Sequence, residues 1–164
     1  MVRVPSARRL VALVLLPATL AGCTSVVATK PGPFATDPVC AQVVLTTPDE
    51  LAEGLTRRDT DAQATTAWGD GSGAVVLRCG VEPLAPTTDR CQTVEAADGT
   101  SVDWVIVASD PDDEQASDWT FTTYGRVPAV QVLVPAEVAQ KHPTSFLDRL
   151  GAAVSLTERE RGCL

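Results

Sequence analysis

The amino-acid sequence predicts an α+β domain, in which an antiparallel sheet of about four to five strands packs in two layers against N-terminal and C-terminal helices. Short β-rich runs separated by turn residues occupy the region from 74 to 134. Helical patterns flank that region, near residues 47–55 and 144–154. Because the strands are grouped rather than alternated with helices, α+β is favoured over a parallel βαβ arrangement.

The N-terminus has the three-part layout of an export signal. Arg3, Arg8 and Arg9 precede an apolar run from Leu10 to Leu20. That run covers only about 17 Å as a helix, whereas the hydrocarbon core of a bilayer is ~30 Å thick. We therefore expect residues 1–22 to be a signal peptide that is removed, rather than a spanning helix.

The cysteine that follows this signal is the expected lipidation site. Leu20-Ala21-Gly22-Cys23 resembles the bacterial lipobox, whose cysteine receives a diacylglyceryl group and becomes the mature N-terminus. Each buried methylene contributes about 0.8 kcal/mol, so two or three fatty chains, such as palmitate, hold a protein on a membrane durably. The expected location is the outer face of the cytoplasmic membrane. An ordinary signal peptide that ends by chance at a buried cysteine is the alternative.

The rest of the chain divides into a linker and one acidic domain. Residues 23–36 are small, polar and proline-bearing, which predicts a flexible tether, and residues 37–164 have the length of a single domain. Residues 1–22 hold three of the 13 Lys and Arg and none of the 21 Asp and Glu, so the remainder has 10 basic against 21 acidic side chains. This balance argues against binding to nucleic acid or to anionic lipid headgroups.

Four cysteines remain after Cys23, and an even number in an exported chain predicts two disulfides. Three pairings are possible. We favour Cys79 with Cys91, as a local link between neighbouring strands, and Cys40 with Cys163, as a link between the two ends of the domain. No metal site or cofactor is expected, since no C-x-x-C occurs and His142 is the only histidine.

The elements follow in order along the domain. Residues 39–45 are apolar and suit a helical turn. Thr47-Pro48-Asp49-Glu50 has the pattern of a capping box, which predicts a short helix through Leu51 and Leu55 that ends near Gly54 and Arg57-Arg58.

The middle of the chain is β-rich. The Asp98-Gly99 turn joins two runs into a hairpin, and Pro128 places the start of the last strand at an edge or at the beginning of the strand. A final helix is expected from the spacing of its apolar residues, with Thr144 or Ser145 as its cap. The expected strands are 74–81, 91–96, 102–108, 119–124 and 127–134, and the apolar residues of the last helix are Phe146, Leu147, Leu150 and Val154.

Several motifs resemble a known family. They are Trp68-Gly69, the run Val76-Leu77-Arg78-Cys79-Gly80, Trp104, and the run from Phe121 to Val130 that contains Tyr124-Gly125-Arg126. Together they resemble the domain of unknown function 3515 family, over most of residues 37–163. The resemblance implies an exported or membrane-attached protein of actinobacteria, in keeping with a lipoprotein. It implies no activity and no catalytic residue.

Two arginines are the candidate ligand-binding residues. Arg78 and Arg126 each interrupt an apolar β-region, where a guanidinium needs a carboxylate or carbonyl partner. Pairing with the domain's own acids is favoured over gripping an anionic ligand.

Other candidate sites have simpler explanations. Trp68, Trp104 and Trp119 with Tyr124 offer flat faces to sugar rings of a cell wall, but aromatic residues are only 4% of the chain, so core packing is favoured. The acidic loop that begins at Asp110 lacks the glycine and the glutamate of an EF-hand, which favours a solvated turn.

The function that these observations favour is a lipid-anchored module of the cell envelope. It is expected to bind another envelope protein or a wall component and to have no catalysis of its own. The alternative is a small envelope hydrolase that uses two acidic residues, such as Asp103 with a partner from another strand.

Overall fold

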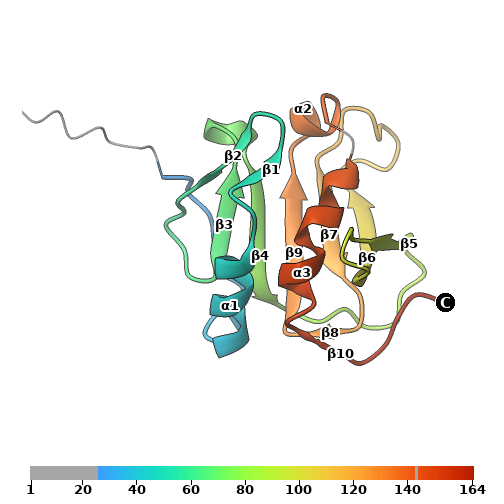
Figure 1. Cartoon of the computed structure of the whole chain (residues 1–164). Coiled ribbons are helices and arrows are strands. Elements are labelled where there is room, and N and C mark those ends of the chain that lie inside the picture. The colour runs from blue at the N-terminus through green and yellow to red at the C-terminus, as the bar shows by residue number, and fades with distance from the viewer. Residues whose placement is uncertain (1–25, 143) are drawn as a thin grey trace, which may run out of the picture.

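The computed structural model describes residues 26–142 and 144–164, and in this part of the chain one antiparallel sheet dominates the fold (Figure 1). Over these residues the sheet has eight strands in the order β1-β2-β3-β4-β9-β7-β6-β5, and β10 pairs with β8 in a separate ribbon. The strands are β1 Glu50–Ala52, β2 Leu55–Arg58, β3 Thr65–Trp68, β4 Val75–Val81, β5 Cys91–Glu95, β6 Ser101–Ala108, β7 Trp119–Thr123, β8 Arg126–Val127, β9 Ala129–Val134 and β10 Glu158–Arg159. The helices are α1 Pro38–Thr46, α2 Ala136–Ala139 and α3 Gly151–Val154, with 3-10 turns η1 Gly71–Gly73 and η2 Thr144–Leu150.

The predicted fold class is therefore wrong in its strand number and in its helices. The main reason lies in residues 50–58, where a hairpin of β1 and β2 replaces the expected helix. Leu51 and Leu55 are buried in either arrangement, so their spacing does not distinguish a helix from a tight hairpin. The hydroxyl of Thr47 donates to the carbonyl oxygen of Val44 at the end of α1, and so it does not cap a following helix.

Strand β3 has no counterpart in the sequence-based prediction. It is only four residues long and every one of them is buried, so its sequence shows no polar alternation. The indole of Trp68 donates to the carbonyl oxygen of Pro48, 2.8 Å away. This bond ties β3 to the segment that leads into β1.

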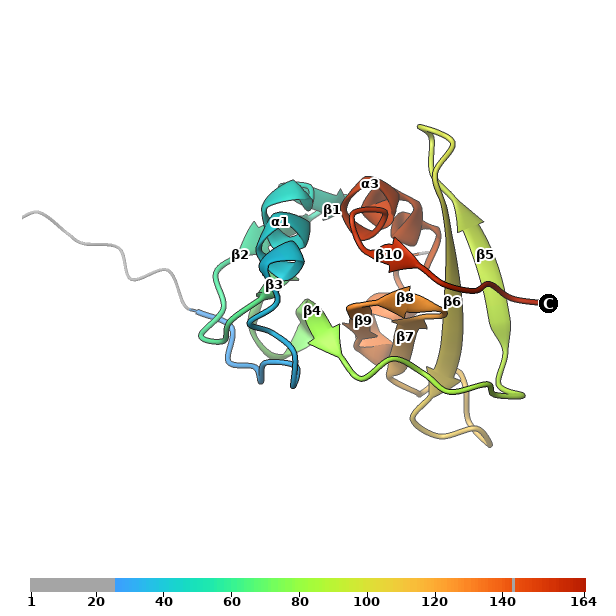
Figure 2. The same ribbon diagram turned by 90° about the horizontal axis from the view of Figure 1, so that it is seen from below.

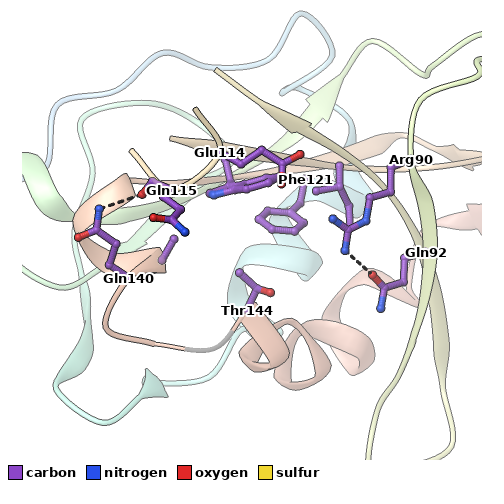
Figure 3. A pocket seen from close by; sticks show the side chains of 10 residues that line it. Arg90, Gln92, Glu114, Gln115, Phe121, Gln140 and Thr144 are labelled. Carbon is purple, nitrogen blue, oxygen red and sulfur yellow. Dashed lines mark hydrogen bonds between the residues drawn. The ribbon is translucent and has the colours of Figure 1, made fainter. Parts of the chain in front are cut away.

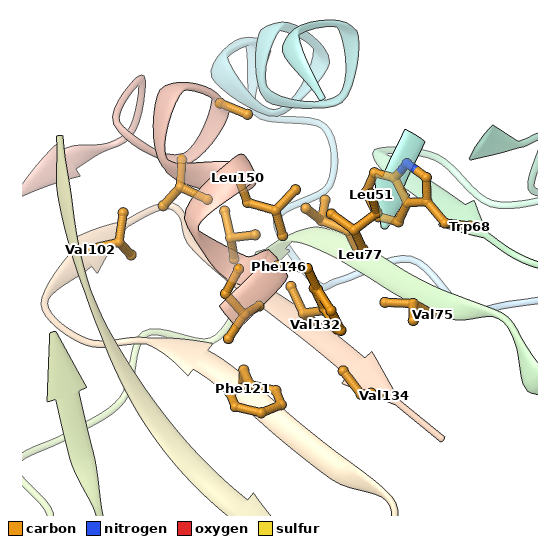
Figure 4. Close-up of a cluster of buried hydrophobic side chains, with 14 of the residues drawn as sticks. Leu51, Trp68, Val75, Leu77, Val102, Phe121, Val132, Val134, Phe146 and Leu150 are labelled. Atoms are coloured by element: carbon orange, nitrogen blue, oxygen red, sulfur yellow. The ribbon is translucent and has the colours of Figure 1, made fainter. Parts of the chain in front are cut away.

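The core lies between one face of the sheet and the helices. In Figure 2, α1 and α3 lie on the same side of β4, β9 and β7. Asp37 caps α1 by accepting from the backbone N–H of Val39. The buried side chains come from alternate positions of the central strands and from η2, α1 and α3. Figure 4 shows Trp68, Val75, Leu77, Phe121, Val132, Val134, Phe146 and Leu150 among them, and Trp104 belongs to the same cluster.

The first described residues pack on the sheet. Val27 forms a parallel bridge with Thr60, and its N–H donates to the carbonyl oxygen of Asp59. Farther along, Phe34 donates to the carbonyl oxygen of Gly80. From Val27 onward, the segment that we expected to be a free tether is therefore held against the domain.

The disulfides join different cysteines from those we favoured. Cys40 pairs with Cys79, which links α1 to β4, and Cys91 pairs with Cys163, which links β5 to the C-terminal tail. The favoured pairs were wrong because β4 and β5 are not neighbours: β9, β7 and β6 lie between them. At ~4.8 Å per strand that separation is about 19 Å, beyond the reach of a disulfide.

The proposed signal peptide and Cys23 lie outside the described residues. In the described part, no helix has the length and the apolar character needed to cross a membrane.

Candidate binding pocket

A pocket of about 790 Å³ opens at one end of the core face of the sheet. Strands β5, β6 and β7 form one side of it, and α2, the start of η2 and the loop 109–118 form the others. This volume is in the ordinary range for a site that takes a small molecule. The residues that line it are Arg90, Gln92, Ile106, Glu114, Gln115, Trp119, Phe121, Ala139, Gln140 and Thr144.

The sheet side of the pocket is aromatic and apolar. Ile106 and Phe121 are directly opposite each other in the pairing of β6 with β7, and Trp119 is two residues before Phe121 on the same face. Phe121 is only 2% exposed, whereas Trp119 is partly exposed. Trp119 is therefore the aromatic ring that a bound molecule would meet.

The rim of the pocket is polar. Figure 3 shows Gln115 and Gln140 on one side of Phe121, Arg90 and Gln92 on the other. The side-chain amide of Gln140 donates to the carbonyl oxygen of Gln115, 2.9 Å away. The guanidinium of Arg90 approaches the amide oxygen of Gln92 at 3.5 Å. Polar groups from three separate elements thus converge around an aromatic centre.

The loop that supplies Glu114 and Gln115 is held by its own hydrogen bonds. The hydroxyl of Ser117, which is 1% exposed, lies 2.8 Å from the carbonyl oxygens of Asp110 and Asp113, to either of which it can donate, and it accepts from the backbone N–H of Asp110. At the end of the loop, the carboxylate of Asp118 accepts from the backbone N–H of Ala136, at the start of α2. These bonds position this side of the pocket.

The charged groups that line the pocket balance each other. Its lining holds one guanidinium, Arg90, and one carboxylate, Glu114, and the other polar side chains are three carboxamides and one hydroxyl. No excess of positive charge is present for a phosphate group, and no cluster of carboxylates for a cation. The arrangement suits an uncharged polar ligand.

Arg126, one of the two candidate arginines, is a structural residue in the described chain. It is 6% exposed, and its guanidinium donates to the carbonyl oxygens of Thr157, Ser101 and Val154 at 2.8, 3.2 and 3.4 Å. Burial, together with the nearby charge of Arg159, lowers the pKa of Arg126 from the ordinary arginine value, and Asp103 partly opposes this shift. Arg126 thereby provides a buried donor to β6, to the last residue of α3 and to the chain that follows α3.

Arg78, the other candidate, lies on the opposite face of the sheet from the pocket. It pairs with Gln131 across β4 and β9, and its guanidinium donates to the amide oxygen of Gln131. That amide donates in turn to the hydroxyl of Thr122. In the described residues Arg78 forms no ion pair, and its buried Nε has no hydrogen-bond partner. The structure thus does not bring Arg78 and Arg126 into one site, and their role in ligand binding stays a prediction.

Asp103, the acid named for the hydrolase alternative, lies away from the pocket. It is 5% exposed, and its carboxylate accepts from the hydroxyl of Thr93, from Arg159 at 3.0 Å and from the backbone N–H of Cys163 at 3.3 Å. These bonds, with the Cys91–Cys163 disulfide, fasten the C-terminal tail to β5 and β6. The burial of the Asp103 carboxylate is therefore explained by its bonds to the C-terminal tail.

The four aromatic residues considered for stacking on sugar rings do not form one surface. Trp68 and Trp104 are fully buried in the core, as the core interpretation expected. Tyr124 lies beneath the guanidinium of Arg161, which is 6.0 Å from the centre of its ring. Trp119 alone of the three tryptophans lines the pocket.

The remaining candidates show no arrangement for metal or acid chemistry. Among the described residues, no group of three His, Cys, Asp or Glu side chains is placed to hold a metal ion. The main-chain N–H of His142 donates to Val138 just after α2, and His142 lines neither of the two pockets described. A second, shallower hollow of about 490 Å³ is lined by Glu50, Glu53 and Asp148, but both glutamates are exposed to solvent.

Sequence reasoning missed most of the pocket, because its residues come from segments far apart in the chain. Trp119 was considered as one of four rings that could stack on sugars, although core packing was favoured, and the acidic loop was considered as a calcium site. Arg90, Gln92 and Gln140 had no signal of their own. Only the sheet pairing and the return of the chain through α2 bring them together.

Comparisons with known proteins give a family and nothing more specific. No curated protein and no solved structure matches the chain. A family model described as "Protein of unknown function (DUF3515)" matches residues 7–162. Since the match covers nearly the whole sequence, the chain belongs to this family of unknown function.

Proposed function

We propose that this protein is a lipid-anchored, extracytoplasmic module of the cell envelope that binds an envelope component in the pocket of Trp119 and does not catalyse a reaction. The observation that carries the binding function is the open pocket with an aromatic side and a polar, charge-balanced rim. Pockets with this mixture are the usual sites for small organic ligands.

The anchoring part of the proposal rests on the sequence Leu20-Ala21-Gly22-Cys23 and on the basic and apolar residues before it. Val27 is packed on the domain, so only a short stretch of chain separates the domain from Cys23. Four residues of chain reach at most about 14 Å, so an acyl group on Cys23 keeps the domain close to the membrane surface. A domain held at this distance from the membrane is surrounded by components of the cell envelope, which are therefore its expected ligands.

No observation favours the hydrolase alternative. A glycosidase of the common kind needs two carboxyl groups that face each other across a cleft, one of them with a raised pKa. The larger pocket is lined by a single carboxylate, Glu114, and Asp103 is bonded to the C-terminal tail.

The anchor is tested by labelling native cells with an alkyne-bearing fatty acid and recovering the protein. We expect label on the wild type, a mature N-terminus at Cys23, and recovery in the membrane fraction. A Cys23→Ser variant should lose the label and should not be processed. An unmodified thiol at Cys23 in the wild-type protein would contradict the proposal.

Binding is tested by sedimenting the full protein, kept in detergent, with washed envelope fragments from which the lipids have been extracted, so that the acyl anchor cannot itself carry the protein into the pellet. Gln92→Trp places a large ring in the pocket from an exposed position of an edge strand, where it leaves the core intact. Phe34→Ala is the control, because it removes an exposed aromatic ring, 46% accessible, that does not line the pocket. We expect the wild type and the control to sediment with the fragments and Gln92→Trp to remain in solution. Equal sedimentation of all three would show that the pocket does not bind an envelope component.

A further inference from the structure

We infer that the pocket takes an uncharged saccharide, with one sugar ring stacked on Trp119 and its hydroxyl groups bonded to the carboxamides of the rim. This inference rests on the proposed binding function and names the chemical class of the ligand. It is argued from three properties of the lining: its aromatic surface, the kind of polar groups, and their charge.

The aromatic surface is flat and of limited area. Trp119 is the partly exposed ring, while Phe121 beside it is 2% exposed and supports it from the sheet. A pyranose has one face of C–H bonds, and such bonds pack favourably on the electron-rich face of an indole. A fatty chain would instead need an apolar lining, and six of the ten lining residues here are polar or charged.

The polar groups suit hydroxyl groups. A carboxamide presents a donor and an acceptor side by side, so it can bond two neighbouring hydroxyls of one sugar at the same time. Three carboxamides line the pocket, those of Gln92, Gln115 and Gln140. Gln92 and Gln140 lie on opposite sides of Phe121 (Figure 3). Thr144 adds a hydroxyl from the start of η2.

The charges exclude most other polar ligands. Arg90 and Glu114 balance each other, and the whole chain has a formal charge of −8, so an anionic ligand such as a nucleotide or a phosphorylated sugar meets no excess of cations. Arg90 and Glu114 also serve hydroxyl groups well, as a fixed donor and a fixed acceptor.

The test uses the full lipidated chain in a detergent without a sugar headgroup, labelled with 5-fluorotryptophan. The chain has three tryptophans, and fluorine NMR gives each its own signal; the Trp119 signal is identified by its loss in Trp119→Phe. Titration with chitotriose, maltotriose and a galactose trisaccharide is expected to shift the Trp119 signal saturably for at least one of them. The signals of Trp68 and Trp104, both 0% exposed, should stay in place.

Variants connect the shift to the pocket. Trp119→Ala should weaken binding of that trisaccharide at least about tenfold, measured by calorimetry, because the stacking surface is lost. Gln92→Ala, on an exposed edge strand, should weaken it about three- to tenfold with the thermal midpoint unchanged. Phe34→Ala should bind like the wild type.

Three results would overturn the inference: no saturable shift of the Trp119 signal with any of the trisaccharides, binding that Trp119→Ala and Gln92→Ala leave unchanged, or a shift produced by adenosine and by none of the sugars. If envelope fragments still bind in a pocket-dependent manner while the sugars do not, the ligand class is wrong and the proposed function stands. If Gln92→Trp also sediments with the fragments as the wild type does, the proposed binding function and the saccharide inference are both wrong.

Discussion

The buried guanidinium of Arg126 donates a 2.8 Å hydrogen bond to the carbonyl oxygen of Thr157, and this contact joins strand β8 to the chain that leaves helix α3. Two further carbonyl oxygens, of Ser101 and Val154, share the same guanidinium. One arginine thus connects β6, β8 and α3. Its position in an apolar β-region, which drew attention to it as a ligand-binding residue, has a structural cause.

Replacement of Arg126 should destabilise the domain. Arg126→Met removes the guanidinium donor from the buried carbonyl oxygens of Thr157 and Ser101, while that of Val154 still accepts from Thr157, and we expect a loss of about 3 kcal/mol in the free energy of unfolding. Arg126→Lys keeps a positive charge and a donor on a shorter side chain, so its free energy of unfolding should fall by less than that of Arg126→Met. Urea denaturation measures both, with Lys141→Met as an exposed control. A stability of Arg126→Met equal to that of the control would contradict the assigned role.

The disulfide pairing can be read by mass spectrometry. Arginines separate Cys40, Cys79, Cys91 and Cys163 from one another, so trypsin places each of these four cysteines in a different peptide. Digestion without reduction should give one peptide pair linked through Cys40 and Cys79 and another linked through Cys91 and Cys163. Both pairs should disappear on reduction. A linked pair containing Cys79 and Cys91 would disprove this topology.

Gly80 should tolerate no side chain. Its φ is +81°, and a Cβ there would lie 2.4 Å from the carbonyl carbon of Phe34. Gly99 offers a matched control, because its φ is +83° but nothing lies within 4 Å of its Cβ position. Both alanine variants pay the cost of the left-handed conformation, about 1 kcal/mol, and only Gly80→Ala adds a clash with the N-terminal segment.

Chymotrypsin gives the corresponding measurement. We expect Gly80→Ala to be cleaved after Phe34 faster than the wild type, since the clash displaces residues 26–36 from the sheet. Gly99→Ala should be cleaved there at the wild-type rate. Equal rates for both variants would mean that the segment does not depend on its contact with Gly80.

The turn between β5 and β6 should show a local pH dependence. Hydrogen bonds from the hydroxyl and the backbone N–H of Thr100 hold the pKa of the Asp98 carboxyl below its usual value of 3.8. Since the folded pKa is lowered, the stabilisation is complete above the ordinary carboxyl pKa and is lost as the pH falls through the lowered value. NMR titration of Asp98 should show the low pKa in the wild type and in Thr100→Ser, and a rise in Thr100→Val. An unchanged pKa in Thr100→Val would rule out the hydroxyl as the cause.

The strands of the middle region could be predicted from sequence because their signals are local. The runs near 75–81, 101–108 and 129–134 are rich in β-branched residues and are bounded by turns, and the structure has strands at all three. The prediction for residues 50–58 was wrong because leucines four apart fit a helix and a hairpin equally well, and because Thr47, read as a helix cap, bonds back to α1. The Gln92, Gln115 and Gln140 carboxamides of the pocket were missed because an isolated glutamine has no periodicity or spacing that marks it.

The sequence alone determined the expectation of export and anchoring, the acidic charge, the positions of the main strands and the need to pair four cysteines, because each depends on composition or on neighbouring residues. Only the tertiary structure decided which cysteines meet, which tryptophan faces solvent and where a pocket opens. Strand order brings these groups together or keeps them apart, and it is set by the burial of one sheet face as a whole rather than by any short stretch of chain.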